Sequence, residues 1–187
     1  ALLRAQAVQY ARAEQAWPQV GLPRTTVVAL WVVFGLLWLQ IALGGWVSTN
    51  YAVLACSDFP TCQGSWWPEM DLRHGFALWR DLGMAHTGDA LPFAALTAIH
   101  YVHRLSAYVV FIALGWLVWR LWAARDTRPT ARWLLALGLW QLLTGVSNVV
   151  FDWPLLAAVA HTGGAAALVI VMTGAIFGTR TAYDTVS

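Results

Sequence analysis

Residues 93–122 read FAALTAIHYVHRLSAYVVFIALGWLVWRLW, a long apolar run whose polar residues lie mostly in its first half. A helix needs roughly 20 apolar residues to cross a hydrocarbon core of about 30 Å, so this run is long enough to span a membrane. Its first half carries two histidines and an arginine, His100, His103 and Arg104. Such groups cost several kcal/mol in a bilayer unless each has a partner, which makes this helix a candidate functional site.

Three further runs are similarly apolar, and they cover residues 25–48, 131–151 and 154–178. Of the 187 residues, 59% are hydrophobic and 11% are charged, and the mean hydropathy is +0.59. An ordinary soluble domain of this length is less apolar. The sequence therefore predicts an all-α membrane protein built as a bundle of four transmembrane helices. A formal net charge of +2 is too small to indicate nucleic-acid binding.

Arginines mark one end of these runs. They are Arg4, Arg12 and Arg24 before the first run, Arg120, Arg125, Arg128 and Arg132 between the second and third, and Arg180 after the fourth. By the positive-inside rule, both termini and the short middle connection are cytoplasmic. The long segment 49–92 and the turn at 152–154 are then external.

The ends of the chain carry weaker signals. Residues 1–24 have no long apolar core and so do not resemble a cleavable signal peptide. We expect a cytoplasmic linker or helix end at 1–24, the four-helix domain at 25–180 and a cytoplasmic tail at 181–187. A chain that begins this way, without methionine, is compatible with a piece of a longer polypeptide.

A short internal similarity links the first and third runs. QIALGGWVSTN (40–50) and QLLTGVSNVV (141–150) share a glutamine, a glycine four residues later and a nearby Val-Ser pair. One interpretation is a repeat of two helices, in which the second and fourth helices run parallel. The other is chance, because short apolar sequences often match.

The second and fourth runs both carry histidine near their external start, and in the fourth run it is His161. At about 1.5 Å per residue, His100, His103 and His161 lie roughly 25–30 Å above the arginines at the inner end. Two neutral imidazoles at equal depth on facing helices are what a six-coordinate heme iron needs. Depth alone leaves the choice between His100 and His103 open.

Small residues near these histidines leave space for a flat ring. Gly164 and Ala165 follow His161 by one turn, and Ala107 follows His103 by one turn. Arg104 could pair with a heme propionate through charge-assisted hydrogen bonds. The alternative is that the histidines hydrogen-bond between helices and the glycines permit close packing. The shared depth, the parallel helices and the small residues together favour heme.

The external segment holds both cysteines, Cys56 and Cys62. The five residues between them, including Pro60, can form a turn that brings the two Cα atoms within the ~7 Å that a disulfide tolerates, on the oxidising side of the membrane. We expect a disulfide, with a structural and a redox role both open. His74 and His86, in the charged part of the segment, are expected to be solvated.

The stretch EMDLRHGFALWRDLGM (69–84) sets Leu72, Phe76 and Trp79 at helical spacing against charged residues. This pattern predicts an amphipathic helix in the membrane interface, where it would cover the heme edge.

These motifs together resemble the carboxy-terminal half of the heme A synthases. The resemblance rests on LGGWVSTN (43–50), CSDFPTC (56–62), QGSWWPEMD (63–71), the pair His103-Arg104 and His161, and it covers about residues 25–180. It implies one four-helix half of an eight-helix enzyme in the bacterial inner membrane. That enzyme oxidises the C8 methyl of heme o to a formyl group, which gives heme A for terminal oxidases.

Carried over to this chain, the resemblance makes His103 and His161 the axial ligands of heme b and pairs Cys56 with Cys62. His103 is further favoured over His100 because Ala107 lies one turn below it. His100 stands where the other half of the family carries its key glutamate, and it would then hydrogen-bond a propionate or water. The chain alone is therefore expected to be inactive. Its partners would be an amino-terminal half, heme o, and heme o synthase, within the lipid bilayer.

Two other classes compete with a synthase. A bis-histidine cytochrome b subunit would pass electrons between quinol and a partner without modifying heme. A quinone-coupled thiol oxidase also has external cysteines on a four-helix bundle, but it needs a second cysteine pair, and this chain has only two cysteines.

Overall fold

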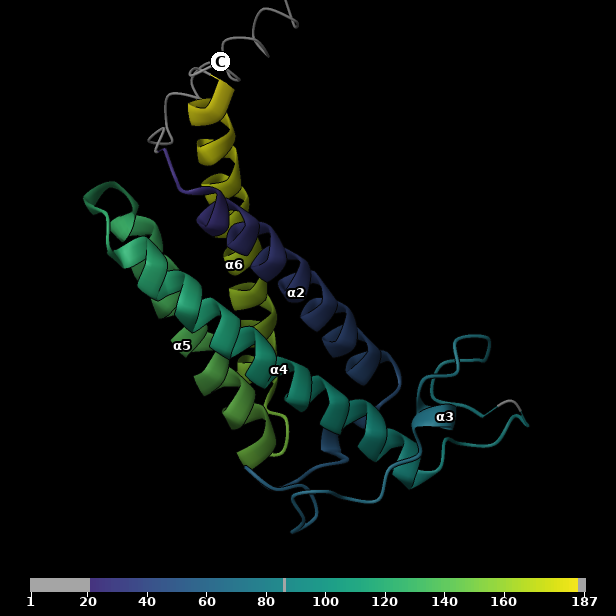
Figure 1. Cartoon of the computed structure of the whole chain (residues 1–187). Helices are drawn as coiled ribbons and strands as arrows, with labels where there is room; N and C mark the ends of the chain where they lie inside the picture. Colours follow the sequence, from purple (N-terminus) through teal and green to yellow (C-terminus); the bar gives the residue numbers. More distant parts are fainter. Residues whose placement is uncertain (1–20, 86, 185–187) are drawn as a thin grey trace, which may run out of the picture.

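The computed structural model describes residues 21–85 and 87–184, and four long helices dominate it (Figure 1). They are α2 (Arg24–Thr49), α4 (Phe93–Trp122), α5 (Arg128–Val150) and α6 (Leu155–Asp184). Each contains an apolar stretch long enough to cross a membrane. Within the described ranges the chain forms no β-strand beyond two isolated bridges. The prediction of an all-α, multi-pass membrane protein is confirmed.

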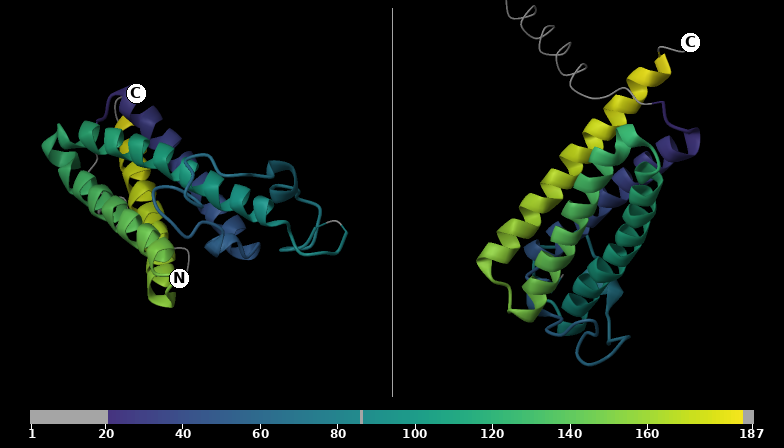
Figure 2. Two further views of the ribbon diagram at one scale, coloured as in Figure 1. Left: turned by 90° about the horizontal axis from the view of Figure 1, so that it is seen from below. Right: turned by 90° about the vertical axis from the view of Figure 1, so that its left-hand side faces the viewer.

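The helices alternate in direction, and two views at right angles agree on their arrangement (Figure 2). α2 packs mainly against α4, and α5 packs mainly against α6. The short turn η2 (Arg125–Thr127) joins α4 to α5 at one end of the bundle, which we call the η2 end. The long segment 50–92, with η1 (Ala52–Leu54) and α3 (Leu72–Gly75), lies at the opposite end, which we call the loop end. α4 and α6 therefore both start at the loop end and run parallel, as the repeat predicts.

The apolar core fills the half of the bundle nearer the η2 end. Every long helix supplies at least one fully buried large side chain to it: Leu30 of α2, Leu117 and Leu121 of α4, Leu134 of α5 and Met172 of α6. Apolar side chains also cover the outside of the bundle, where Ile112 is 74% exposed. Lipid tails are as apolar as these side chains, so the outer surface suits a bilayer.

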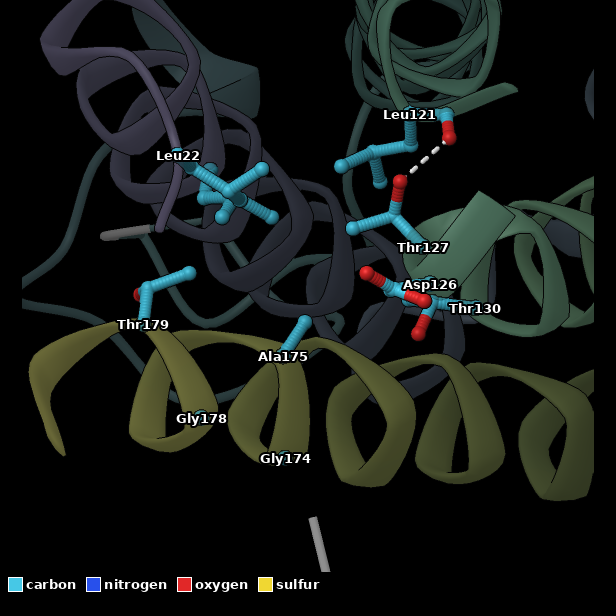
Figure 3. A pocket seen from close by; sticks show the side chains of 10 residues that line it. Leu22, Leu121, Asp126, Thr127, Thr130, Gly174, Ala175, Gly178 and Thr179 are labelled. Atoms are coloured by element: carbon cyan, nitrogen blue, oxygen red, sulfur yellow. Dashed lines mark hydrogen bonds between the residues drawn. The ribbon is translucent and has the colours of Figure 1, made fainter. Parts of the chain in front are cut away.

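The η2 end holds a small pocket. The Thr127 hydroxyl donates to the Leu121 carbonyl at 2.5 Å, which satisfies an acceptor in the last turn of α4. The pocket beside this bond, between η2 and residues Ala175 and Thr179 of α6, measures only about 30 Å³ (Figure 3). That is roughly the volume that one water molecule occupies in the liquid. This pocket is therefore too small for a large ligand.

Segment 50–92 is held to the loop end of α2 by a buried polar cluster. The Arg80 guanidinium donates to the Asn50 side-chain oxygen at 2.8 Å and to the Met84 carbonyl at 3.1 Å, and it lies 5.5 Å from the centre of the Trp46 ring. Burial lowers the pKa of Arg80. These bonds give the segment a fixed course although it has little secondary structure.

The prediction of an amphipathic helix within 69–84 is wrong, because α3 (Leu72–Gly75) ends after four residues. The Gly75 carbonyl accepts from the Trp46 indole at 2.9 Å and from Arg80 at 3.2 Å. In a longer helix the Trp79 N–H would bind this carbonyl. Trp79 is instead 90% exposed, so it covers no site within the described chain.

The expected domain boundaries can be compared only in part. α2 begins at Arg24, next to the expected start at 25, and α6 continues to Asp184, beyond the expected end at 180. The remaining residues of the expected linker and tail, 1–20 and 185–187, lie outside the described residues.

Candidate functional site

A cavity of about 810 Å³ occupies the loop half of the bundle, where the apolar core stops. Ligand sites in proteins typically measure about 300–1,000 Å³, so this cavity can hold a large cofactor. All four long helices line it. Their polar contributions are Gln40 and Ser48 of α2, His100, His103, Arg104 and Tyr108 of α4, Gln141 and Asn148 of α5, and His161 and Thr162 of α6.

His103 faces the cavity from α4 and contacts α2. The Gln40 amide nitrogen lies 3.1 Å from Nδ1 of His103 and donates to the His103 carbonyl, also at 3.1 Å. A Cβ added to Gly44 would stand 3.1 Å from Cε1 of the same imidazole. Any larger residue at position 44 would therefore push the His103 imidazole out of its observed position.

His161 faces the same cavity from α6 and contacts α5. The Gln141 amide nitrogen donates to the His161 carbonyl at 2.8 Å, and the Thr144 hydroxyl lies 2.9 Å from Nδ1 of His161. A Cβ added to Gly145 would stand 3.3 Å from Cε1 of this imidazole. The two glutamine-glycine pairs of the internal similarity thus contact one histidine each, which favours a repeat of two helices over a chance match.

His100 lies one turn nearer the loop end and is 5% exposed. Its Nδ1 is 2.9 Å from the Ala52 carbonyl of η1. A carbonyl only accepts, so Nδ1 carries the proton and donates it to Ala52. His100 therefore links α4 to the loop segment, and it also reaches the wall of the cavity.

Arg104 is 7% exposed and fastens the cysteine loop to α4. Its guanidinium donates to the carbonyls of Asp58 and Thr61 at 2.8 Å and of Cys56 at 2.9 Å. Its Nε is buried and has no protein partner, and the residue lines the cavity. Arg104 therefore holds the loop to α4 and has one buried donor group that no described residue satisfies.

The predicted disulfide between Cys56 and Cys62 is confirmed, with a Cα–Cα distance of 4.8 Å. Both cysteines are buried and pack against Tyr101 of α4. Beside them the Thr61 hydroxyl donates to the Asp58 carboxylate, and this bond holds the pKa of Asp58 below its usual range. The disulfide, Arg104 and Asp58 together give this loop a defined shape at the mouth of the cavity, which Phe59 lines.

The small residues near the histidines differ in where they face. Ala107 and Ala165 line the cavity, as expected. The expectation for Gly164 is wrong, because a Cβ there would stand 2.3 Å from the Gln141 amide and 2.6 Å from the Trp140 ring. Gly164 allows α6 to approach α5 and gives no space to a ligand, whereas its neighbour Gly163 lines the cavity.

The cavity offers nitrogen ligands and no acidic ones. In the described part of the chain no aspartate or glutamate lines it. The described residues also contain no group of three or more histidine, cysteine or acidic side chains that could hold a metal ion. Two imidazoles in a large apolar cavity are the protein ligands that a bis-histidine heme iron needs, so the donor set fits heme better than a bare metal ion.

The other two histidines lie apart from this cavity or outside the description. His74 is in the loop segment, with its Nδ1 2.5 Å from the Asp71 carboxylate and nearly half of its side chain exposed. His86 lies outside the described residues.

Sequence reasoning did not assign Gln40, Gly44, Thr144 or Gly145 to the site. The signal was present in the internal similarity, which contains both glutamine-glycine pairs. Which residues they contact could not be read from it, because contacts between helices depend on how each helix is rotated about its axis.

Comparison with known proteins adds family information to this geometry. Residues 1–173 match the COX15-CtaA family, described as cytochrome oxidase assembly protein. A protein named heme A synthase from Shewanella oneidensis is 35% identical over 146 residues, which cover 78% of this chain and 43% of that protein. The heme A synthase of Erythrobacter litoralis is 35% identical over 173 residues, covering 90% of this chain and 45% of the relative.

A third relative, the heme A synthase of Paracoccus denitrificans, is 29% identical over 155 residues, covering 80% of this chain and 37% of its own length. The chain thus spans less than half the length of these relatives. No solved structure gives a significant match to the chain.

Proposed function

The chain belongs to the heme A synthase family of cytochrome oxidase assembly proteins, and we propose that it acts as the heme b-binding carboxy-terminal half of such a synthase. The observation that carries this proposal is that His103 and His161 line one large cavity from two parallel helices. Each histidine is also held by an equivalent set of contacts from the neighbouring helix.

In this proposal His103 and His161 are the axial ligands, and the heme lies between α4 and α6. The bound heme would supply one-electron chemistry, while the protein sets its potential through the ligands, burial and nearby charge. Ala107 and Ala165 leave room beside the ligands. The unpartnered Nε of Arg104 would donate to a propionate, and His100 would lie beside that propionate while it holds the loop.

The proposed role of the whole enzyme is to oxidise the C8 methyl of heme o to a formyl group. The cavity described above has no carboxylate to act as a base or proton acceptor, so we place methyl oxidation in an amino-terminal half. This chain alone is then inactive. Its partners are that half, heme o, and heme o synthase, and its place is the bacterial inner membrane with both termini in the cytoplasm.

The lack of a carboxylate in the cavity also favours a second candidate, a bis-histidine cytochrome b subunit that carries electrons between quinol and a partner. The two candidates differ in what the assembled protein does to heme. Assembly with an amino-terminal half converts heme o to heme A if the chain is half of a synthase. No new heme forms if the chain is only an electron carrier.

The first experiment measures heme in the purified chain. Extraction and a pyridine hemochrome assay identify the heme, and the absorption spectrum of the oxidised protein reports its spin state. The proposal predicts heme b with a low-spin spectrum. A folded chain that purifies without heme from cells supplied with heme would disprove it.

A further inference from the structure

Two glutamines hold the main chain of the two proposed ligand histidines in the same way. Gln40 of α2 donates to the carbonyl of His103, and Gln141 of α5 donates to the carbonyl of His161. A carbonyl inside a helix has a second lone pair available after its helical hydrogen bond. Each glutamine uses it, and so joins one long helix to its neighbour at the position of the histidine.

Each glutamine is followed after one turn by a glycine that contacts the edge of the same imidazole. Residues four apart lie on one face of a helix, so Gln40 and Gly44 face His103 together, and Gln141 and Gly145 face His161. The Cβ positions of these glycines stand 3.1 and 3.3 Å from Cε1 of the respective rings, closer than ordinary contact allows. A side chain at either position would force the ring to turn or shift.

We propose that Gln40 with Gly44, and Gln141 with Gly145, are two equivalent pairs of positioning residues, and that each pair sets the orientation of one axial imidazole. The inference rests on the proposed function, because it assigns these pairs a purpose only if His103 and His161 bind heme iron. It also supports the choice of His103 over His100, which binds the carbonyl of η1 at the loop end.

The two pairs are not identical at the ring nitrogens. The Gln40 amide nitrogen contacts the imidazole of His103 itself, at 3.1 Å from Nδ1 and 3.4 Å from Nε2, as well as the His103 carbonyl. Gln141 contacts only the main chain of His161 among the described residues, and the Thr144 hydroxyl lies beside the ring instead. Replacement of Gln40 should therefore disturb the heme more than replacement of Gln141.

The test uses the purified heme-bound chain and four alanine variants. Gly44→Ala and Gly145→Ala place a methyl group against a ligand imidazole. Gly35→Ala and Gly115→Ala are matched controls on α2 and α4, because an added Cβ there meets nothing within 4 Å. The readouts are the electron paramagnetic resonance spectrum of the ferric heme, which depends on the orientation of the two imidazole planes, and the midpoint potential.

We expect a changed low-spin signal and a shifted potential in Gly44→Ala and Gly145→Ala, and wild-type values in both controls. Identical spectra in all four variants, or equal changes in all four, would overturn the inference. If a glycine variant does not fold, Gln40→Leu and Gln141→Leu decide instead. A shift in both, larger for Gln40→Leu, supports the inference, and no shift in either overturns it. A wild-type chain without heme would instead disprove the proposed function itself.

Discussion

The Thr144 hydroxyl lies 2.9 Å from Nδ1 of His161, and it donates its own proton to the Trp140 carbonyl at 2.7 Å. A hydroxyl has one proton to give, so with that proton on the Trp140 carbonyl its oxygen accepts from Nδ1–H of His161. That tautomer has an unprotonated Nε2, which is the form of the ring that can bind a metal. Thr144, which lies between Gln141 and Gly145 on α5, thus gives His161 the tautomer that a proposed iron ligand requires.

Thr144→Val should raise the midpoint potential of the bound heme. Valine keeps the shape of threonine but cannot accept from Nδ1–H, so the imidazole becomes less basic and stabilises the ferric state less. Redox titration of the purified chain measures this. Ser147→Ala is the matched control, because Ser147 lies on the same helix and, among the described residues, its hydroxyl donates to the Leu143 carbonyl and not to a histidine. An unchanged or lowered potential in Thr144→Val would contradict the assignment.

His103→Ala and His161→Ala should each abolish the low-spin bis-histidine spectrum, whereas His100→Ala should keep it with a shifted midpoint potential. His100 donates to Ala52 and contributes to the cavity wall without the glutamine-glycine contacts that the other two receive. Absorption spectra of the three oxidised variants provide the measurement. Loss of the low-spin signal in His100→Ala, with retention in His103→Ala, would reverse the assignment.

Cys56→Ser should lower the free energy of unfolding by about 2–3 kcal/mol, the chain-entropy value for so short a loop. The heme should stay low-spin, because the disulfide packs against Tyr101 and does not line the cavity. Denaturant unfolding in detergent and the absorption spectrum test both parts. Ser57→Ala, at an exposed position in the same loop, is the control. A folded Cys56→Ser chain without the low-spin signal would place a cysteine at the iron.

Arg104→Lys should loosen the cysteine loop although it keeps the positive charge. A lysine ammonium cannot reach the three carbonyls that the arginine fork binds, and buried carbonyls without donors are costly. We expect the free energy of unfolding to fall by about 2–4 kcal/mol. Amides of residues 56–62 should exchange with deuterium faster. Arg73→Lys, at an exposed position of α3, serves as the control. If the amides of residues 56–62 exchange at the wild-type rate in Arg104→Lys, Arg104 does not hold the cysteine loop in place.

Cells that make heme o and express only these 187 residues should accumulate no heme A. The cavity supplies two nitrogen ligands and no carboxylate, so methyl oxidation needs another site. Heme extraction followed by chromatography detects heme A directly. Co-expression with an amino-terminal half from a relative is the positive control. Heme A in cells that lack that half would show that this chain is active alone.

The sequence by itself determined the membrane architecture. A bilayer requires about 20 apolar residues for each spanning helix, so the four runs predicted α2, α4, α5 and α6 to within a few residues except at the end of α6. The rise per residue of a helix is constant, so counting residues predicted that the three histidines lie near one level, and all three line one cavity. The disulfide followed from two cysteines separated by a short turn.

Only the tertiary structure decided which side chains meet. Gln40 and His103 are 63 residues apart in the chain, and their contact depends on how α2 and α4 are rotated about their axes. The same rotations turn Ala165 into the cavity and Gly164 towards α5. In the loop, Trp46 and Arg80 take the Gly75 carbonyl and end a helix that the local pattern would have continued. Local sequence specifies which segments form helices and how long they are. The contacts between helices and the end of α3 depend on residues that packing brings together from distant parts of the chain.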